Sequence, residues 1–506
     1  MIRAAQLLLL LMMMACSQLP AGEPAFDVQA AWSQPVEHEH EQVHEQVHEH
    51  EQVHEQEQVQ EQECSDANAN EASETQASER PVIFDEQIAV AGYGTGGTAT
   101  VDDDLAAVVQ QEVSQLVWRK GDIRVTPYGI LWTDAILSTN RTFPGNFILY
   151  AESSATQGEN TFEIDARRSR VGIDIAGPTY DYLGGLTSAG KVEIDFLGGF
   201  VNPNTTDLRL RHAYWEATND EYRLLVGQTW DVVSPLRPNT VNFSVNWAAG
   251  NIGFRRTQFR SERTFALDSG NVIIQSAIAQ TIVPDLTGGT LAAGVVRESG
   301  GWPMLQGRVA WTQATHASSQ DPIAVGFSGH LGETGFDFTQ TGPGPAQLPP
   351  QLDARIRSWS ANADWIVPLS KRARVTGEFF VGENLSNLLG GINQGVCPCL
   401  RTPIGSTGGW IELAYDWTPD LHSHVGFGID DPNNQDSLIG RSRNQVIYTN
   451  LFVDLTRHLK TGLEVSVWET QYHNLTLNDP NPALWIDGPT TPGEAVTVDL
   501  TVQYHF

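Results

Sequence analysis

The sequence predicts an all-β protein, a 16-stranded antiparallel transmembrane β-barrel that follows a disordered acidic N-terminal segment and a short N-terminal helix. Three observations predict this fold. From residue 122 to the end, segments of alternating polar and apolar residues are separated by breaks rich in Gly, Asn and Asp. The connections between these segments are short and long in turn, which is typical of the two rims of a transmembrane barrel. The last segment, 496–506, alternates without a break and ends on Phe506.

The first residues predict an export signal. Arg3 precedes an apolar run at 7–15, and the small residues Cys16 and Ser17 follow it. This run is too short to cross a bilayer. We assign residues 1–17 to a signal peptide, in which Cys16 is a relaxed lipoprotein-type site, so lipid attachment at Cys16 stays open as the alternative to ordinary cleavage nearby.

Residues 18–100 are predicted to be an acidic, low-complexity spacer rich in Gln and His. Residues 23–112 hold 22 Asp and Glu residues against one Arg, a net charge of −21 out of −31 for the whole chain. A segment with so many like charges and so few apolar residues stays disordered, and its acidity excludes nucleic acid as a partner. We predict no cofactor and no metal site. A loose zinc or copper site is the weaker alternative, because irregular spacing separates the histidines of the spacer, His38, His40, His44, His48, His50 and His54.

Residues 101–120 are predicted to form an amphipathic helix. Acidic residues at 102–104 suit its N-terminus, Arg119 and Lys120 suit its C-terminus, and Gly121 ends it. One apolar stripe follows from the spacing of Leu105, Val108, Val109, Val113, Leu116 and Val117. Because an isolated helix of this length is marginal in water, we expect the stripe to pack against a coiled-coil partner or against the barrel.

Residues 121–506 are predicted to form the barrel itself. We expect its strands near 123–137, 161–176, 189–200, 207–218, 221–231, 253–265, 271–283, 303–315, 321–332, 353–367, 372–384, 408–418, 421–431, 443–456, 459–473 and 495–506. The longest connections are 232–252, 333–352, 385–407 and 474–494. An even number of strands with its long loops at one rim favours a barrel over a soluble sandwich.

Two parts of the sequence resemble bacterial outer-membrane porins. The last strand, which carries Tyr504 and Phe506, is similar to the assembly signal that the barrel-assembly machinery reads in that class. Within 166–260, the stretches ARRSRVGIDIAGP, GKVEIDFLGG, LRLRHAYWEA and LLVGQTWDVVSPL resemble the DcaP-type branch of trimeric porins. The resemblance implies a homotrimer in outer-membrane lipid, a periplasmic N-terminal segment with a helix, and passive diffusion of small hydrophilic solutes. The long acidic spacer departs from the pattern of this branch.

The strand phases place two sets of charged residues on the inner face of the predicted barrel. The basic set is Arg168, Arg170, Arg209, Arg211, Arg256 and Arg260, and the acidic set is Glu378, Glu412, Asp416, Glu464 and Asp499. Two facing walls of opposite charge would orient charged solutes in the bore. The alternative is that the arginines only pair with neighbouring carboxylates, and we expect Glu193 and Asp195 to form such pairs.

The segment 232–252 follows the fifth strand, where porins of this kind fold a loop inward to narrow the pore. Pro235 and Pro238 would rigidify this loop, and Asp231 and Arg237 carry the charges of the segment. With few acids at the constriction, we expect weak selectivity that leans to anions.

Other function classes stay open at this point. A barrel enzyme is not supported, because the scattered histidines form no convincing Ser/His/Asp set and no GxSxG motif occurs, so we predict no enzyme. A non-conducting structural or adhesive barrel, with its tail directed to the cell wall, is the alternative to the porin. The spacing of Cys397 and Cys399 in "CPC" is too tight for an unstrained disulfide, and we expect both in a surface loop, oxidised or free.

Overall fold

The computed structural model of the protein describes residues 117–155, 159–198, 207–281, 295–313, 322–341, 348–437, 439–476, 486–487 and 490–506. The chain divides into two units, Met1–Phe84 and Asp85–Phe506, and every described residue lies in the second. The predicted signal peptide, the spacer and residues 101–116 of the predicted helix lie outside the described residues. Among the described residues, no helix is long and apolar enough to cross a membrane.

The predicted helix does not reach its expected end. Trp118–Lys120 form strand β1, which pairs antiparallel with β2 (Ile123–Ser138), with Trp118 opposite Val125. The charged residues Arg119 and Lys120, which we interpreted as a helix C-terminus, therefore belong to a strand at the barrel rim.

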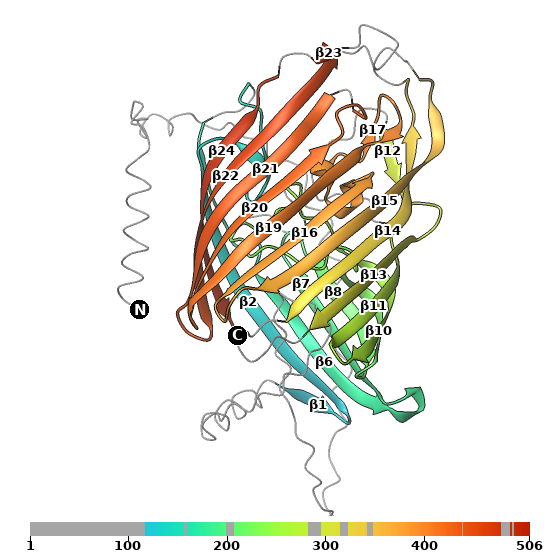
Figure 1. The fold of residues 1–506 in the computed structure, drawn as a ribbon, viewed down its shortest axis with the longest axis vertical. Coiled ribbons are helices and arrows are strands. Elements are labelled where there is room, and N and C mark those ends of the chain that lie inside the picture. The colour runs from blue at the N-terminus through green and yellow to red at the C-terminus, as the bar shows by residue number, and fades with distance from the viewer. Residues whose placement is uncertain are drawn as a thin grey trace, which may run out of the picture. The chain divides into compact units, whose positions relative to one another are not determined.

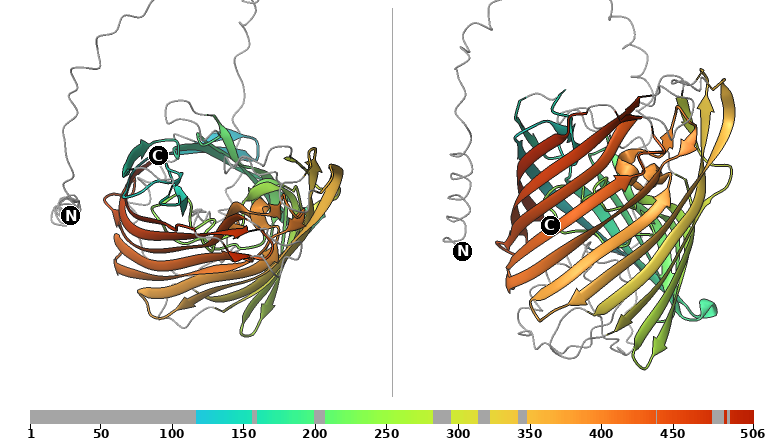
Figure 2. Two further views of the ribbon diagram at one scale, coloured as in Figure 1. Left: turned by 90° about the horizontal axis from the view of Figure 1, so that it is seen from above. Right: turned by 45° about the horizontal axis from the view of Figure 1, so that its top comes forward.

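The described strands form a closed 16-stranded antiparallel barrel, as the sequence predicts (Figures 1 and 2). The wall runs through β2, β5 (Thr161–Asp165) continued by β6 (Arg170–Tyr180), β7 (Leu186–Asp195), β8 (Arg209–Thr218), β9 (Tyr222–Trp230), β10 (Arg255–Leu267), β11 (Gly270–Ala279), β13 (Met304–Gln313), β14 (Ile323–Phe338), β15 (Gln351–Pro368), β16 (Ala373–Glu383), β19 (Gly405–Thr418), β20 (Leu421–Pro432), β21 (Ile439–Asp454), β22 (Leu459–Thr476) and β24 (Gly493–His505). Each strand pairs with the next, and β24 pairs with β2. Closure satisfies the backbone groups that an open sheet edge would leave without partners.

The end of the chain makes the closing contact. The N–H of Phe506 donates to the carbonyl oxygen of Gly129 at 3.0 Å, and the N–H of Gly129 donates back to Phe506 at 2.9 Å. The Phe506 ring lies against Gly129, where a Cβ would come within 2.3 Å of the ring carbon Cζ. A glycine on the first strand is therefore needed for the terminal aromatic ring to pack there.

The outer face of the wall is apolar, as the alternation predicts. Phe379, Ile411 and Val467 are each about half exposed on this face. The residues next to them in sequence, such as Glu378 and Glu412, point to the inner face and are buried. A continuous surface of exposed Leu, Ile, Val and Phe side chains is what a lipid-facing barrel wall presents.

The connections differ in length at the two rims. The turns after β10, β15, β19 and β21 are two to four residues long, whereas long segments join β2 to β5, β9 to β10 and β16 to β19. The loop predicted at 333–352 is shorter than expected, because β14 extends to Phe338 and β15 begins at Gln351. The long connections contain β3 (Thr142–Pro144), β4 (Ile148–Ala151), β12 (Val295–Glu298), η2 (Leu385–Leu388), η3 (Gly391–Asn393), β17 (Val396–Cys397), β18 (Thr402–Pro403) and β23 (Ile486–Asp487).

The apolar core lies inside the barrel, where three of these connections pack together. We name them loop A (139–160), loop B (231–254) and loop C (384–404). One cluster joins Phe147 of loop A, Trp247 of loop B and Ile392 of loop C, each less than 5% exposed. A second cluster packs Ile148 of loop A against Trp468 on the inner face of β22. Folding of the loops into the barrel thus buries apolar side chains that the alternation of the strands does not reveal.

Candidate functional site: the inner wall and loop B

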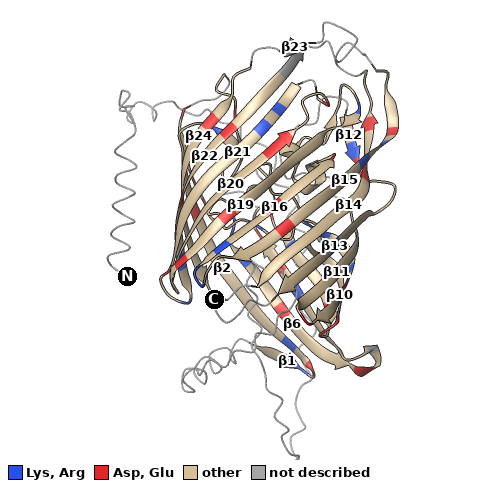
Figure 3. Cartoon of the chain, in the orientation of Figure 1, with Lys and Arg blue, Asp and Glu red and all other residues tan. Residues whose placement is uncertain are grey.

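Three carboxylates of the inner wall hold loop B. Most residues of the strands are uncharged, and charged residues are scattered among them (Figure 3). Burial of a charged side chain is costly unless the side chain is paired or hydrogen-bonded. Glu378 on β16, Glu412 on β19 and Glu464 on β22 are each 3% exposed or less. Glu378 accepts hydrogen bonds from the Ser234 hydroxyl and from the Leu236 N–H at 2.7 Å. Glu412 accepts from the backbone N–H and the side-chain amide of Asn239, both at 2.7 Å. Glu464 accepts from the Val241 N–H at 2.8 Å.

These bonds follow from the irregular backbone of loop B. Its N–H groups have no backbone acceptors on a neighbouring strand, so other buried acceptors must take the place of strand partners. Carboxylates suit this role because they make stronger hydrogen bonds than neutral groups do. Side chains of the wall donate to the same carboxylates. The Tyr448 hydroxyl reaches Glu412 at 2.6 Å, and the Trp410 indole reaches Glu378 at 3.2 Å. Loop B therefore covers these three carboxylates of the predicted acidic wall.

Asp231 and Arg256 join the two ends of loop B. The Asp231 N–H donates to the carbonyl oxygen of Phe254 at 2.9 Å, and the Asp231 carboxylate accepts from the Phe254 N–H at 2.9 Å. Arg256 forms an ion pair with Asp231 at 2.6 Å, and it donates to the carbonyl oxygen of Asn387 in loop C at 2.9 Å. This predicted wall arginine therefore ties loops B and C to β10.

The other predicted arginines lie on the inner face, and most are paired there. Arg168 pairs with Asp134 (2.8 Å), and Arg260 pairs with Glu262 (2.6 Å). As expected, Glu193 and Asp195 also pair with arginines: the bonds are Arg209 to Asp195 (2.5 Å), Arg211 to Asp195 (2.9 Å) and Arg211 to Glu193. Arg170 lies 4.9 Å from the Trp132 ring. The pairing agrees in part with the alternative interpretation, in which the arginines stiffen the wall.

Arg255 is an inner-wall arginine that the sequence analysis missed. Alternation on β10 places Arg256 inward and would turn Arg255 outward, but Arg255 is only 2% exposed. Its Nε and Nη2 atoms have no hydrogen-bond partner among the described residues. Its guanidinium lies 4.4 Å from the Trp230 ring, and that of Arg237 lies 4.0 Å from the same ring. Because Arg255 is the first residue of β10, directly after loop B, its side chain does not follow the strand phase.

The surroundings of Arg255 carry excess positive charge. Its electrostatic neighbours include Arg170, Arg209, Arg211 and Asp195, and Arg168 in turn neighbours Arg170 and Arg211. The carboxylates that pair with this group are Asp134, Glu193 and Asp195. Arg255 adds a further positive charge to this group, and its Nε and Nη2 atoms have no hydrogen-bond partner among the described residues. An aromatic ring stabilises part of the positive charge of this group, since the guanidinium groups of Arg168 and Arg209 both lie near the Phe243 ring of loop B.

Asp416 and Asp499, the other two predicted acids, have different surroundings. Asp416 lies near the end of β19, partly exposed, with His422 at 2.7 Å and Arg374 at 3.6 Å, and it does not contact loop B. Asp499 is buried on β24 opposite Glu464 of β22, and its Oδ1 has no hydrogen-bond partner among the described residues. Of the loop residues, Pro235 and Pro238 lie in the stretch that the carboxylates hold.

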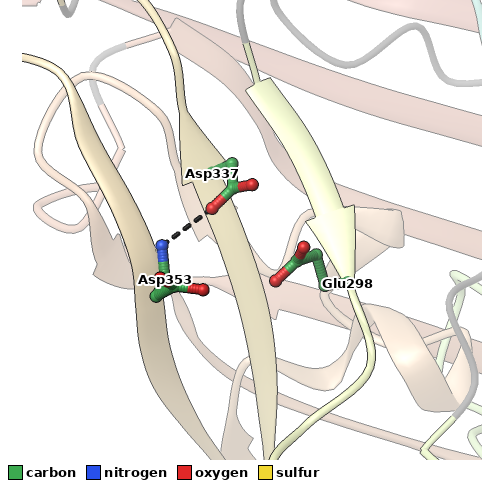
Figure 4. A group of neighbouring side chains, drawn as sticks. All are labelled: Glu298, Asp337 and Asp353. Atoms are coloured by element: carbon green, nitrogen blue, oxygen red, sulfur yellow. Dashed lines mark hydrogen bonds between the residues drawn. The ribbon is translucent and has the colours of Figure 1, made fainter.

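Three carboxylates gather away from the inner wall. Glu298 on β12, Asp337 on β14 and Asp353 on β15 place oxygen atoms within 4.8 Å of one another (Figure 4). The Asp353 N–H donates to Asp337 at 2.7 Å. These side chains are partly or fully exposed, so water screens their repulsion and no bound ion is required.

The chain was compared with known proteins. No protein-family model and no curated protein matches it. It is similar in structure to the outer membrane channel DcaP of Acinetobacter baumannii, with a TM-score of 0.58 and 16% sequence identity over 77% of this chain and 99% of that chain. An anion-selective porin from Comamonas acidovorans has a TM-score of 0.47 and 12% identity, over 76% of this chain and 100% of that chain. The likeness to DcaP shows that the two proteins share a fold, in agreement with the predicted resemblance.

Proposed function

We propose that this protein is an outer-membrane porin, through which small hydrophilic solutes diffuse passively, and that its inner wall favours anions. In this proposal loop B is the constriction loop, and the buried arginines around Arg255 set the electrostatic potential of the narrow part of the pore. The observation that carries the proposal is the charge balance at loop B. Its backbone N–H groups engage the acids of one side of the wall, whereas on the other side Arg255 adds a positive charge whose Nε and Nη2 atoms have no hydrogen-bond partner among the described residues.

The electrostatic effect of this imbalance is large in a narrow bore. Two unit charges 4 Å apart interact with about 4 kcal/mol at the effective dielectric constant typical of protein sites. An anion that passes Arg255 would gain part of this energy, and a cation would meet the same barrier. Since the arginine pairs and aromatic rings screen part of the field, we expect a moderate preference for anions and no exclusion of neutral solutes.

The remaining parts of the proposal concern assembly and location. The aromatic end of the chain, Tyr504 and Phe506, would be the signal that the barrel-assembly machinery reads. The N-terminal segment would lie in the periplasm, and the barrel would be a homotrimer in outer-membrane lipid. The fold shared with the channel DcaP supports this location.

A second candidate function is favoured by the packing inside the barrel. Leu385 and Leu388 of loop C and Ile148 of loop A have no exposed surface, so the three loops fill part of the bore with apolar side chains. This arrangement suits a non-conducting structural or adhesive barrel. Conductance separates the two candidates, because only a porin passes ions.

The test is ion selectivity in a planar bilayer, measured as the reversal potential in a KCl gradient. We expect stepwise ohmic currents with a reversal potential toward that of chloride, and a loss of this preference in Arg255→Gln. The matched control is Arg357→Gln, since Arg357 is an exposed arginine at the rim, with a side chain 70% exposed. An unchanged reversal potential in Arg255→Gln would contradict the role of this arginine, and silent bilayers would favour the structural barrel.

A further inference from the structure

Two cysteines lie together on a small hairpin of loop C. Strands β17 and β18 pair with Cys397 opposite Thr402, and the N–H of Arg401 donates to the carbonyl oxygen of Cys397 at 2.7 Å. Neither cysteine is part of a disulfide. Cys397 is 2% exposed, whereas Cys399 is partly exposed.

The two thiols are adjacent, and their surroundings are apolar. Cys397 and Cys399 pack in one cluster with Leu400 and Ile404, and a hydrogen bond joins the two side chains. This hydrogen bond and partial burial raise the pKa of the Cys399 thiol. A disulfide between residues two apart in sequence is strained, which favours the dithiol form.

The hairpin is held in place from several sides. The Arg401 guanidinium donates to the carbonyl oxygens of Pro349 and of Leu348 (3.0 Å), and it lies 4.7 Å from the Phe338 ring. The N–H of Ile404 donates to the carbonyl oxygen of Gly395 at 2.9 Å, which closes the base of the hairpin. A pair of ligands on such a fixed turn loses little conformational entropy when it binds.

We propose that Cys397 and Cys399 form a binding site for one soft monovalent metal ion, such as Cu(I). Thiolates are soft ligands that select soft ions over Mg²⁺ or Ca²⁺. Among the described residues, no histidine or carboxylate joins the two thiols in a group close enough to share an ion. Zn²⁺ prefers four protein ligands in structural sites, so two sulfur atoms favour an ion of low coordination number.

The binding step exchanges protons for the metal ion. One monovalent ion binds two thiols, two protons leave to water, and the bis-thiolate complex carries one net negative charge. No electron is transferred. Because two protons are released, the apparent affinity should rise about 100-fold for each pH unit while both thiols are protonated.

The test uses the purified full chain in detergent, with Ag(I) as a soft probe that does not change oxidation state. We expect one tightly bound ion per barrel by native mass spectrometry, a 100-fold rise in affinity per pH unit, and loss of this ion in Cys397→Ser and in Cys399→Ser. The matched control is the Cys16→Ser/Cys64→Ser variant, which removes the other two cysteines of the chain and should keep the ion.

The proposal also makes a prediction for the unmutated barrel, in case the serine variants do not fold. Ag(I) should protect the partly exposed Cys399 from alkylation by iodoacetamide, and removal of Ag(I) should restore the reaction. Retention of the ion in folded Cys399→Ser, or alkylation of Cys399 at the same rate with and without Ag(I), would overturn the proposal. The test does not depend on ion conduction, so its failure leaves the proposed porin function untouched.

Discussion

The hydrogen bonds between loop B and the inner wall make a quantitative prediction for Glu412→Gln. The Glu412 carboxylate accepts from the Asn239 N–H (2.7 Å), the Asn239 side-chain amide (2.7 Å) and the Tyr448 hydroxyl (2.6 Å). Glutamine replaces one carboxylate oxygen by an NH₂ group, which then faces a donor of the loop or of Tyr448. At least one charge-assisted bond is lost, and such a bond contributes about 1.5–3 kcal/mol.

A loss of about 2 kcal/mol raises the population of undocked loop roughly 30-fold, because each 1.4 kcal/mol corresponds to a factor of ten. We expect Glu412→Gln to add brief transitions between two current levels to an otherwise quiet open channel. The second level corresponds to undocked loop B, and the fraction of time spent in it should rise by about this factor. Single-channel recording measures it. The matched control is Glu469→Gln, a partly exposed glutamate of β22 that accepts from Gln445 and Gln471 and does not contact loop B. If the current of Glu412→Gln is as quiet as that of the control, the carboxylate does not hold the loop.

The remaining predictions concern the ends of loop B, barrel closure and assembly. Arg256→Met leaves the buried Asp231 carboxylate without its ion-pair partner and should lower the free energy of unfolding by about 3–5 kcal/mol. The double variant Asp231→Asn/Arg256→Met should recover part of this lost stability. If denaturant titrations show the same loss of stability for the single and the double variant, the two side chains are not coupled. Phe506→Ala should reduce the amount of folded barrel in outer-membrane fractions, as seen by heat-modifiable migration in gels, and normal amounts would contradict its role as assembly signal. Chemical crosslinking of detergent-purified protein should give a band at three times the mass of one chain, and a band no larger than one chain would contradict the homotrimer.

The strands and their closure were predictable because alternation has a period of two residues and applies along the whole wall. Register follows from it: once Leu131 and Tyr504 face outward on neighbouring strands, the inner residues between them are fixed. The helical periodicity at 101–120 predicted the structure less well. The last residues of this range, Trp118–Lys120, form a strand, because they pair with β2.

The inner site was predictable only in part. The alternation identified Glu378, Glu412 and Glu464 as inward residues, but loop B covers them, and the backbone N–H groups that do so leave no signal in the sequence. Arg255 was missed because it begins a strand directly after a loop, where the phase of alternation is not yet set. The apolar residues of loops A and C gave no periodic pattern at all, although residues such as Ile148 and Leu388 have no exposed surface.

The central claim is that solutes pass through the barrel beside the docked loops, and swelling of proteoliposomes tests it most directly. Vesicles that contain the purified barrel are diluted into isotonic solutions of a pentose, of a trisaccharide and of a small organic anion of matched size. We expect fast swelling in the pentose, faster swelling in the small anion and none in the trisaccharide. Vesicles with correctly inserted barrel that swell in none of the three solutions would contradict it.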